Sequence, residues 1–351
     1  MRSPDASDQG GEQRGPVVYV GSYTPDRGNG AGIAVCRQDA TSGLLGVPSA
    51  VIPAVSPSYL ARHPSGRFLY AVSEHGEGAV GAYAVRGERL VPLGEVSTLG
   101  AGPCHVAVDP SGRCVVVANY GAGSVTAHRI ADDGSLGEAS TRMRLNGSGP
   151  VKGRQASSHA HQVTFVGGWL VVCDLGSDTV YHLSCDAGAG TIAKGPELSL
   201  PPGTGPRHIA HGPGGFAWLA GELNASVTPL RCDPDTGTLT VAGRPFTLGE
   251  GTGAPSGIVV SADGRFVYVA NRGPDTVSVL AVDGTDLCLV EEVPTGGAWP
   301  REVALVNGVL LVANQRGDTI TAFRPDPHTG TLAPLGVALS TGSPTSVLAA
   351  P

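Results

Sequence analysis

The sequence predicts an all-β protein folded as a single seven-bladed β-propeller, and three observations lead to this fold class. First, a segment recurs along the 351-residue chain at intervals of 44–56 residues. Second, the chain contains 53 glycines and 28 prolines, a content that indicates very frequent turns. Third, 41% of the residues are hydrophobic and only 15% are charged, so the chain can bury a core and is not disordered.

The repeat is clearest in two segments, PCHVAVDPSGRCVVVANYGAGSVTAHRI from Pro103 and PSGIVVSADGRFVYVANRGPDTVSVLAV from Pro255. The complete unit occurs six times, and its first strand alone returns near the C-terminus. The start points are Pro57, Pro103, His159, Pro206, Pro255, Pro300 and Pro344. A period of roughly 40–50 residues with four short strands is typical of a propeller blade. A pair of β-sandwiches is the competing architecture, and seven matching start points argue against it.

Each unit divides into the same elements in the same order. A first strand (HVAV) enters a D-P-S-G-R turn, and a second strand (CVVVAN) returns beside it. A G-x-G-S or G-x-D-T turn precedes the third strand (VTAHRI), and a D-x-x-T-G-x-L turn, as at Asp233–Leu239 and Asp326–Leu332, precedes the fourth. Glycine and aspartate supply the positive φ angles and local hydrogen bonds of such turns. Alternation within the strands is weak, as expected for sheets packed on both faces.

The two ends of the chain complement each other. Pro344–Ala350 reads as a first strand without partners, whereas Val17–Ala54 contains a second, third and fourth strand but no first. We therefore expect these segments to form the seventh blade, with the C-terminal strand innermost, and closure of the ring removes an open sheet edge. The expected domain covers residues 16–351. Residues 1–15 are polar and glycine-rich, lack the apolar core of a secretory signal, and are expected to form a flexible tail.

Composition excludes several classes of partner. The net charge of −7, without a basic stripe, argues against nucleic acid. No apolar run approaches the roughly 18 residues of a membrane span. The seven cysteines contain no C-x-x-C pair and no metal-ligand spacing, so we expect no metal, no cofactor and a reduced, cytoplasmic protein. Four of them, Cys104, Cys114, Cys173 and Cys288, lie in apolar strand-like contexts where free thiols act as small hydrophobes.

The propeller pattern predicts where a binding site would lie. The first two strands of each blade form an antiparallel hairpin, so the start of the first lies beside the end of the second. Because first strands line the central channel, these positions form the rim of one channel mouth. The strand starts are Ser58-Tyr59, Cys104-His105, Ala160-His161, Arg207-His208, Ser256-Gly257, Arg301-Glu302 and Thr345-Ser346. The strand ends are Tyr23, Glu74, Tyr120, Leu175, Glu222, Arg272 and Gln315.

This mouth is enriched in charged residues and histidines, which is the strongest functional signal in the sequence. An inserted loop, Asn146–His161, brings Lys152, Arg154, Gln155 and His159 to the same place. The alternative interpretation is that any propeller mouth is polar because it faces solvent. For His105, His208 and Tyr120 a purely structural hydrogen bond is an equally good interpretation. A further set that recurs at one blade position is expected to fix a turn: Asn119, Asp174, Asn271 and Asn314.

Together these motifs resemble the lactonase-type seven-bladed propellers, which include 6-phosphogluconolactonases and a fungal enzyme that cyclises carboxy-muconate to its lactone. The resemblance covers Val17 to Ala350. The segments that carry it, in order, are Val20–Thr24 (VGSYT), Gly102–Arg113, Val117–Gly121 (VANYG), Gly153–His161 (GRQ and HAH), Gly205–His208 (GPRH) and Val269–Gly273 (VANRG). A single motif such as D-P-S-G-R is common to many propellers, whereas the ordered set is specific.

The resemblance implies a metal-free site of one histidine, two arginines and a glutamate. The H-A-H segment supplies His161 or His159, and the two arginines are Arg207 and Arg272. The glutamate is Glu222, although Gly221 replaces the asparagine that usually precedes it. Seven further residues of the mouth are expected to contact substrate: Arg154, His159, His105, Tyr120, Glu74, Arg301 and Gln315.

These residue types suit lactone chemistry. Either Glu222 or a neutral His161 can activate water as a general base, and Arg207 and Arg272 can hold an anionic substrate and offset the charge of the tetrahedral intermediate. The hypothesis is an intracellular lactonase of carbohydrate metabolism that acts on a small anionic sugar lactone, above all 6-phosphogluconolactone. The alternatives are a lactone-forming cyclase or isomerase, and a non-catalytic propeller that binds a ligand or protein. The oligomeric state is left open.

Overall fold

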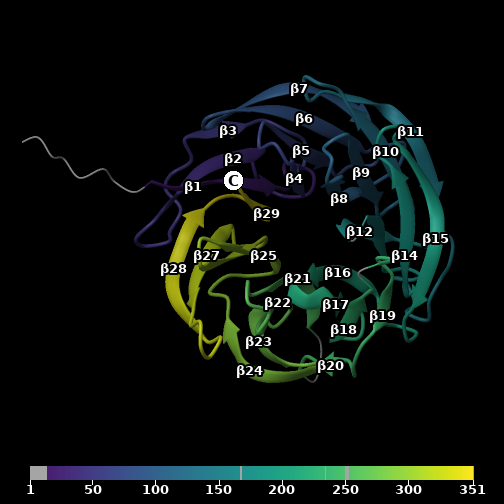
Figure 1. The fold of residues 1–351 in the computed structure, drawn as a ribbon. Helices are drawn as coiled ribbons and strands as arrows, with labels where there is room; N and C mark the ends of the chain where they lie inside the picture. Colours follow the sequence, from purple (N-terminus) through teal and green to yellow (C-terminus); the bar gives the residue numbers. More distant parts are fainter. Residues whose placement is uncertain (1–13, 167, 234, 250–252, 351) are drawn as a thin grey trace, which may run out of the picture.

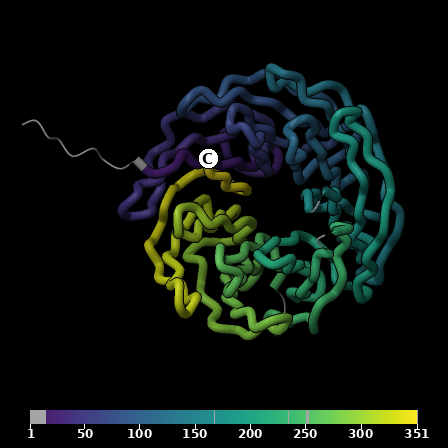
Figure 2. Tube along the Cα trace, in the orientation of Figure 1, coloured from purple at the N-terminus to yellow at the C-terminus, as the bar shows by residue number. Residues whose placement is uncertain are grey.

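The computed structural model describes residues 14–166, 168–233, 235–249 and 253–350, and it is a ring of seven sheets, six with four strands and one with five (Figures 1 and 2). From the innermost strand outward, blade 1 consists of β29 (Pro344–Ala349), β1 (Arg14–Ser22), β2 (Ile33–Asp39) and β3 (Ala50–Ile52), and blade 2 consists of β4 (Leu60–Arg62), β5 (Phe68–Ser73), β6 (Ala79–Arg86) and β7 (Arg89–Ser97). Blade 3 consists of β8 (Pro103–Val108), β9 (Cys114–Asn119), β10 (Ser124–Ile130) and β11 (Leu136–Arg144). Blade 4 consists of β12 (Ala160–Val166), β13 (Trp169–Asp174), β14 (Thr179–Asp186) and β15 (Thr191–Ser199).

Blades 5 to 7 follow the same plan. Blade 5 consists of β16 (Pro206–His211), β17 (Phe216–Gly221), β18 (Ser226–Cys232) and β19 (Leu239–Val241), and the short β20 (Phe246–Thr247) also pairs with β18. Blade 6 consists of β21 (Ala254–Val260), β22 (Phe266–Arg272), β23 (Thr276–Asp283) and β24 (Asp286–Pro294). Blade 7 consists of β25 (Pro300–Val306), β26 (Val309–Asn314), β27 (Thr319–Pro325) and β28 (Leu332–Ser340). A 3-10 turn at Pro213–Gly215 connects β16 to β17. The predicted seven-bladed propeller is therefore confirmed.

The ring closes as the sequence predicts. Strand β29 pairs antiparallel with β1, with Tyr19 opposite Leu348 and Val20 opposite Val347, so the two ends of the chain share blade 1 (Figure 1). Strand β1 begins at Arg14, two residues before the expected start of the domain, and residues 1–13 of the expected tail lie outside the described residues.

The core lies between the blades. The apolar side chains of the described residues form seven clusters, and each cluster fills the interface between two neighbouring blades. The second strands are buried along their whole length in β5, β9 and β26, whereas the outer strand β7 is mostly exposed and buries only Leu90. Weak alternation in the inner strands thus follows from packing on both sheet faces.

Two sequence-based expectations concern single side chains. Asn119, Asp174, Asn271 and Asn314 hydrogen-bond within the turns of their own blades, as in the contacts of Asp174 with the backbone N–H of Gly176 and the hydroxyl of Ser177. They therefore fix turns, as expected. Cys288 was expected in an apolar context, but its side chain is exposed because it lies on the outer strand β24. Within the described ranges, no helix has the length and apolar character needed to cross a bilayer.

Candidate active site

Among the described residues, a one-residue β-bulge at the start of the innermost strand leaves an extra residue at the channel mouth in five of the seven blades. In blade 3, Pro103 pairs with Asn119 and His105 pairs with Ala118, so Cys104 is the extra residue between them. The same break in register occurs in four other blades, at His161, Arg207, Arg301 and Thr345. Bulges redirect a side chain and end regular pairing, which explains why chemically different residues gather here.

The bulges also correct the alignment of the repeats. By simple spacing, the pair Ala160-His161 corresponds to Cys104-His105. The observed register instead equates His161 with Cys104, Arg207 and Arg301, because Gln162 pairs with Cys173 just as His105 pairs with Ala118. The residues after the bulges, including His208 and Glu302, lie one step deeper and line the central channel, a cavity of about 560 Å³ bounded by the inner strands.

The strand-end residues are held by a hydrogen bond that recurs from blade to blade. The backbone N–H of Glu222 donates to the carbonyl oxygen of Gly205 at 2.9 Å, and those of Glu74 and Tyr120 donate to the equivalent carbonyls at 3.1 and 2.8 Å. This bond ties the end of each second strand to the loop before its first strand. Glu74, Tyr120 and Glu222 are therefore fixed by backbone geometry at the mouth, as the hairpin argument predicts.

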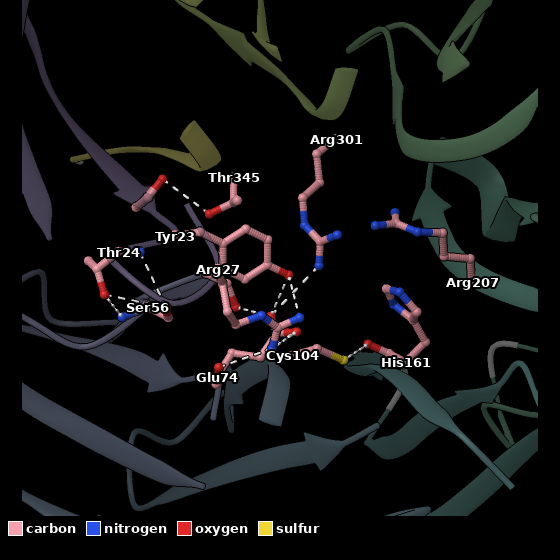
Figure 3. A network of polar contacts seen from close by, with 12 residues as sticks. Tyr23, Thr24, Arg27, Ser56, Glu74, Cys104, His161, Arg207, Arg301 and Thr345 are labelled. Atoms are coloured by element: carbon pink, nitrogen blue, oxygen red, sulfur yellow. Dashed lines mark hydrogen bonds and ion pairs between the residues drawn. The ribbon is translucent and has the colours of Figure 1, made fainter. Parts of the chain in front are cut away.

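These two sets of residues enclose a pocket of about 180 Å³ at the mouth. Its lining is Tyr23, Arg27, Glu74, Cys104, Tyr120, Arg154, His161, Glu222, Arg272 and Arg301. Figure 3 shows Arg301 between the side chains of Tyr23, Arg27 and Glu74 and those of His161 and Arg207. The pocket thus has two walls, each built around one carboxylate.

Glu222 forms the first wall with three arginines. Its Oε2 lies 2.6 Å from Nη2 of Arg272 and 3.1 Å from Nε of Arg207, and its Oε1 lies 2.5 Å from Nη2 of Arg154. The Arg154 side chain is 42% exposed, whereas Glu222 and Arg207 are almost fully buried. Burial by itself would raise the pKa of Glu222, but Arg272, Arg207 and Arg154 outweigh it and lower this pKa to about 2.

The imidazole of His161 lies beside this wall in its neutral form. Its pKa is well below the usual value because the side chain is buried and because Arg207, Arg301 and Arg272 disfavour a further positive charge. Nδ1 of His161 is buried and has no hydrogen-bond partner among the described residues. The low pKa values make both groups weak bases before substrate binds, but they differ in their contacts. Glu222 is engaged by three arginines, whereas the uncharged imidazole keeps a nitrogen that has no partner in the described part of the chain and can accept a proton.

The remaining predicted site residues occupy three kinds of position. Arg154, Tyr120, Glu74 and Arg301 line the pocket with His161, Glu222 and Arg272. Arg207 lies behind the pocket wall and contacts Glu222, while Gln315 does not line the pocket. His159 stacks on Tyr120 with ring centroids 4.6 Å apart, and its Nδ1 contacts the Tyr120 carbonyl, so of the two candidate histidines only His161 lines the pocket.

His105 lies below the pocket rather than in it. Its ring stacks on Tyr59 at 3.7 Å between centroids and contacts His208 at 5.3 Å. Burial lowers its pKa to about 3, so it is uncharged at neutral pH. In the inserted loop, Gln155 is buried and donates to the carbonyl of Leu175 and to the carboxylate of Asp178, which is a structural role.

Two of the pocket residues, Arg27 and Cys104, were not identified as site residues from the sequence. Arg27 lies in the loop between β1 and β2, outside the repeated positions, so no repeat points to it. Cys104 occupies a recognised strand start, but its apolar context suggested a core thiol. Among the described residues, no group of three or more His, Cys, Asp or Glu side chains is arranged to hold a metal ion.

Comparison with known proteins identifies similar chains over almost the whole length. The family described as "Lactonase, 7-bladed beta-propeller" matches residues 17–349. The 6-phosphogluconolactonase of Bacillus subtilis is 33% identical over 94% of this chain and 97% of its own length, and that of Formosa agariphila is 29% identical over 90% and 94%. The solved structure of the periplasmic gluconolactonase of Pseudomonas aeruginosa is 31% identical, covers 96% of this chain and 99% of its own, and superposes with a TM-score of 0.89.

Proposed function

The chain belongs to the seven-bladed β-propeller lactonase family, and on this premise we propose that it hydrolyses 6-phosphogluconolactone to 6-phosphogluconate. The observation that carries the proposal is the first wall of the pocket, where a neutral His161 lies beside arginines that Glu222 holds in place. A lactonase needs a base for water and positive charge for the oxyanion, and this wall supplies both.

In the proposed mechanism His161 is the general base. It accepts a proton from water as the water oxygen attacks the lactone carbonyl carbon. Arg272, which lines the pocket, and Arg207 behind it offset the negative charge that develops on the carbonyl oxygen. The imidazolium then returns the proton to the ring oxygen as the C–O bond breaks, which yields a carboxylic acid and an alcohol. The acid ionises on release.

Glu222 is assigned a positioning role in this mechanism. With a pKa of about 2 it stays ionised through the reaction and keeps three guanidinium groups oriented toward the pocket. Substrate binding assists His161, because an anionic substrate offsets the arginines that depress the pKa of this histidine. The proposed base therefore becomes stronger when the substrate is bound.

The test is a hydrolysis assay on 6-phosphogluconolactone, followed by proton release and corrected for spontaneous ring opening, in the wild-type protein and a His161→Asn variant. We expect turnover in the wild type and a loss of roughly 10²–10⁴-fold in kcat in the variant, the usual contribution of a general base. Wild-type protein without lactone hydrolysis above background would contradict the proposed function. Full activity in a folded His161→Asn protein would instead contradict the role of His161.

We also propose a cytoplasmic location. All seven cysteines are free, five of them buried, as is usual in a reducing compartment. Fractionation of the native cells tests this proposal, and recovery of the protein from the periplasm or medium would contradict it.

A further inference from the structure

The second wall of the pocket is built around Glu74 and lies opposite the first wall, which is built around Glu222. The Tyr23 hydroxyl donates to Oε2 of Glu74 at 2.9 Å (Figure 3), and the hydroxyl of Ser58 donates to the same oxygen. Nη1 of Arg27 lies 2.9 Å from Oε1, and Nη2 of Arg301 lies 3.7 Å from Oε2. The proposed reaction uses none of these groups, although four of them line the pocket.

Arg27 and Arg301 are held near each other by one aromatic ring as well as by one carboxylate. Their guanidinium carbons lie 4.6 and 5.0 Å from the centroid of the Tyr23 ring. Arg27 also donates to the backbone carbonyl of Glu74 at 3.0 Å. The Arg27 side chain is 41% exposed and that of Arg301 is 14% exposed, so the pair reaches from the channel to the solvent side of the mouth.

The charges of this mouth do not balance. In the ion-pair clusters that the described residues form around Glu74 and Glu222, five guanidinium groups face two carboxylates, which leaves a surplus of three positive charges. Glu74 offsets only one of the two arginines in its wall. A buried or half-buried surplus of this kind is unfavourable until an anion occupies the pocket.

We propose that Arg27, Arg301 and Tyr23 form a subsite for the phosphate group of the substrate, across the pocket from the wall where the lactone reacts. A phosphate monoester carries a charge close to −2 at neutral pH, and the oxyanion of the reacting lactone adds one more. These negative charges would offset most of the surplus. Two guanidiniums fixed in place suit phosphate oxygens, because arginine presents planar, paired donors.

This assignment rests on the proposed lactonase function and adds its substrate selectivity. Arg272 and Arg207 are less suited to the phosphate because Glu222 already engages both, and Nε of Arg272 donates to the carbonyl of Ala254 at 3.2 Å. Arg27 differs from them in its exposure and in its place on a loop. It can therefore meet a phosphate that enters from solvent.

The test compares Arg27→Met with a matched control, Arg37→Met. Both arginines belong to blade 1 and pair with a glutamate of blade 2, and both are partly exposed, but Arg37 lies in the third strand of the blade, β2, beside Glu88 and outside the pocket lining. We expect Arg27→Met to lower kcat/KM for 6-phosphogluconolactone by roughly tenfold or more, the loss typical of a charged hydrogen bond. The value for unphosphorylated gluconolactone should change less than about threefold, and Arg37→Met should change neither.

Calorimetric titration with 6-phosphogluconate and with gluconate provides a readout that does not need turnover. We expect the wild type to prefer the phosphorylated ligand and Arg27→Met to lose this preference. Equal losses for both lactones, or an unchanged preference in Arg27→Met, would overturn the subsite. If the wild type hydrolyses neither lactone, the proposed function fails, and the titration alone then decides: an Arg27-dependent preference supports the subsite and its absence overturns it.

Discussion

Glutamine in place of Glu222 and in place of Glu302 should change the stability of the protein in opposite directions. Both carboxylates are buried, Glu222 at the mouth pocket and Glu302 in the central channel, and both substitutions remove a charge while keeping the shape. Glu222 is held by three arginines. Glu302 has no such partner among the described residues, and its carboxylate accepts only the backbone N–H of Val303 at 3.3 Å.

The magnitudes follow from the two pKa values. That of Glu222 is about 2 against an ordinary 4.5, and one pKa unit corresponds to about 1.4 kcal/mol, so its charge stabilises the fold by about 3 kcal/mol at neutral pH. Burial raises the pKa of Glu302 to about 7 despite the nearby Arg207. Above pH 7 its ionised form therefore costs about 3 kcal/mol, which Glu302→Gln removes.

The pH dependence distinguishes the two effects. Because the pKa of Glu222 is lowered, its contribution is complete above pH 4.5 and is lost as the pH falls toward 2. Because the pKa of Glu302 is raised, the wild type loses stability as the pH rises from 4.5 to about 7 and loses no more beyond it. The stabilisation by Glu302→Gln should thus be largest at pH 8 and absent near pH 4.5.

The assay is chemical denaturation of both variants and the wild type at pH 8 and pH 5, which gives the free energy of unfolding of each. At pH 8 Glu222→Gln should be less stable and Glu302→Gln more stable than the wild type. Shifts of the same sign, or a Glu222→Gln protein as stable as the wild type, would refute the reasoning about buried charge.

Three further predictions follow from the fold and the site. Deletion of residues 344–351 removes β29 and leaves β1 unpaired on its inner edge, so we expect insoluble or strongly destabilised protein; a soluble truncation that melts with the wild type would contradict closure of the ring. Exhaustive chelation should leave lactone hydrolysis unchanged, since the proposed base and arginines act without a metal; activity that falls with chelator and returns with one divalent ion would contradict this mechanism. His159→Asn should reduce kcat far less than His161→Asn, because His159 stacks on Tyr120 outside the pocket; comparable losses in steady-state assays would show that the two histidines act together.

The sequence by itself determined the architecture. Its seven repeat starts and the complementary ends of the chain predict seven blades and the inner position of Pro344–Ala350, and β29 lies there. The same pattern located the mouth, because a hairpin places the start of one strand beside the end of the next whatever its side chains are. Turn residues and strand periodicity are local properties, so they can be read without knowing the rest of the fold.

Only the tertiary structure decided how the mouth residues divide their roles. A one-residue bulge turns His161 into the pocket while His105 lies below it, and a bulge is invisible to spacing alone. Arg27 joins Glu74 and Arg301 from a loop outside the repeat. Opposite pKa shifts at Glu222 and Glu302 arise because charges interact across blades that are far apart in the sequence, and burial sets the strength of each interaction.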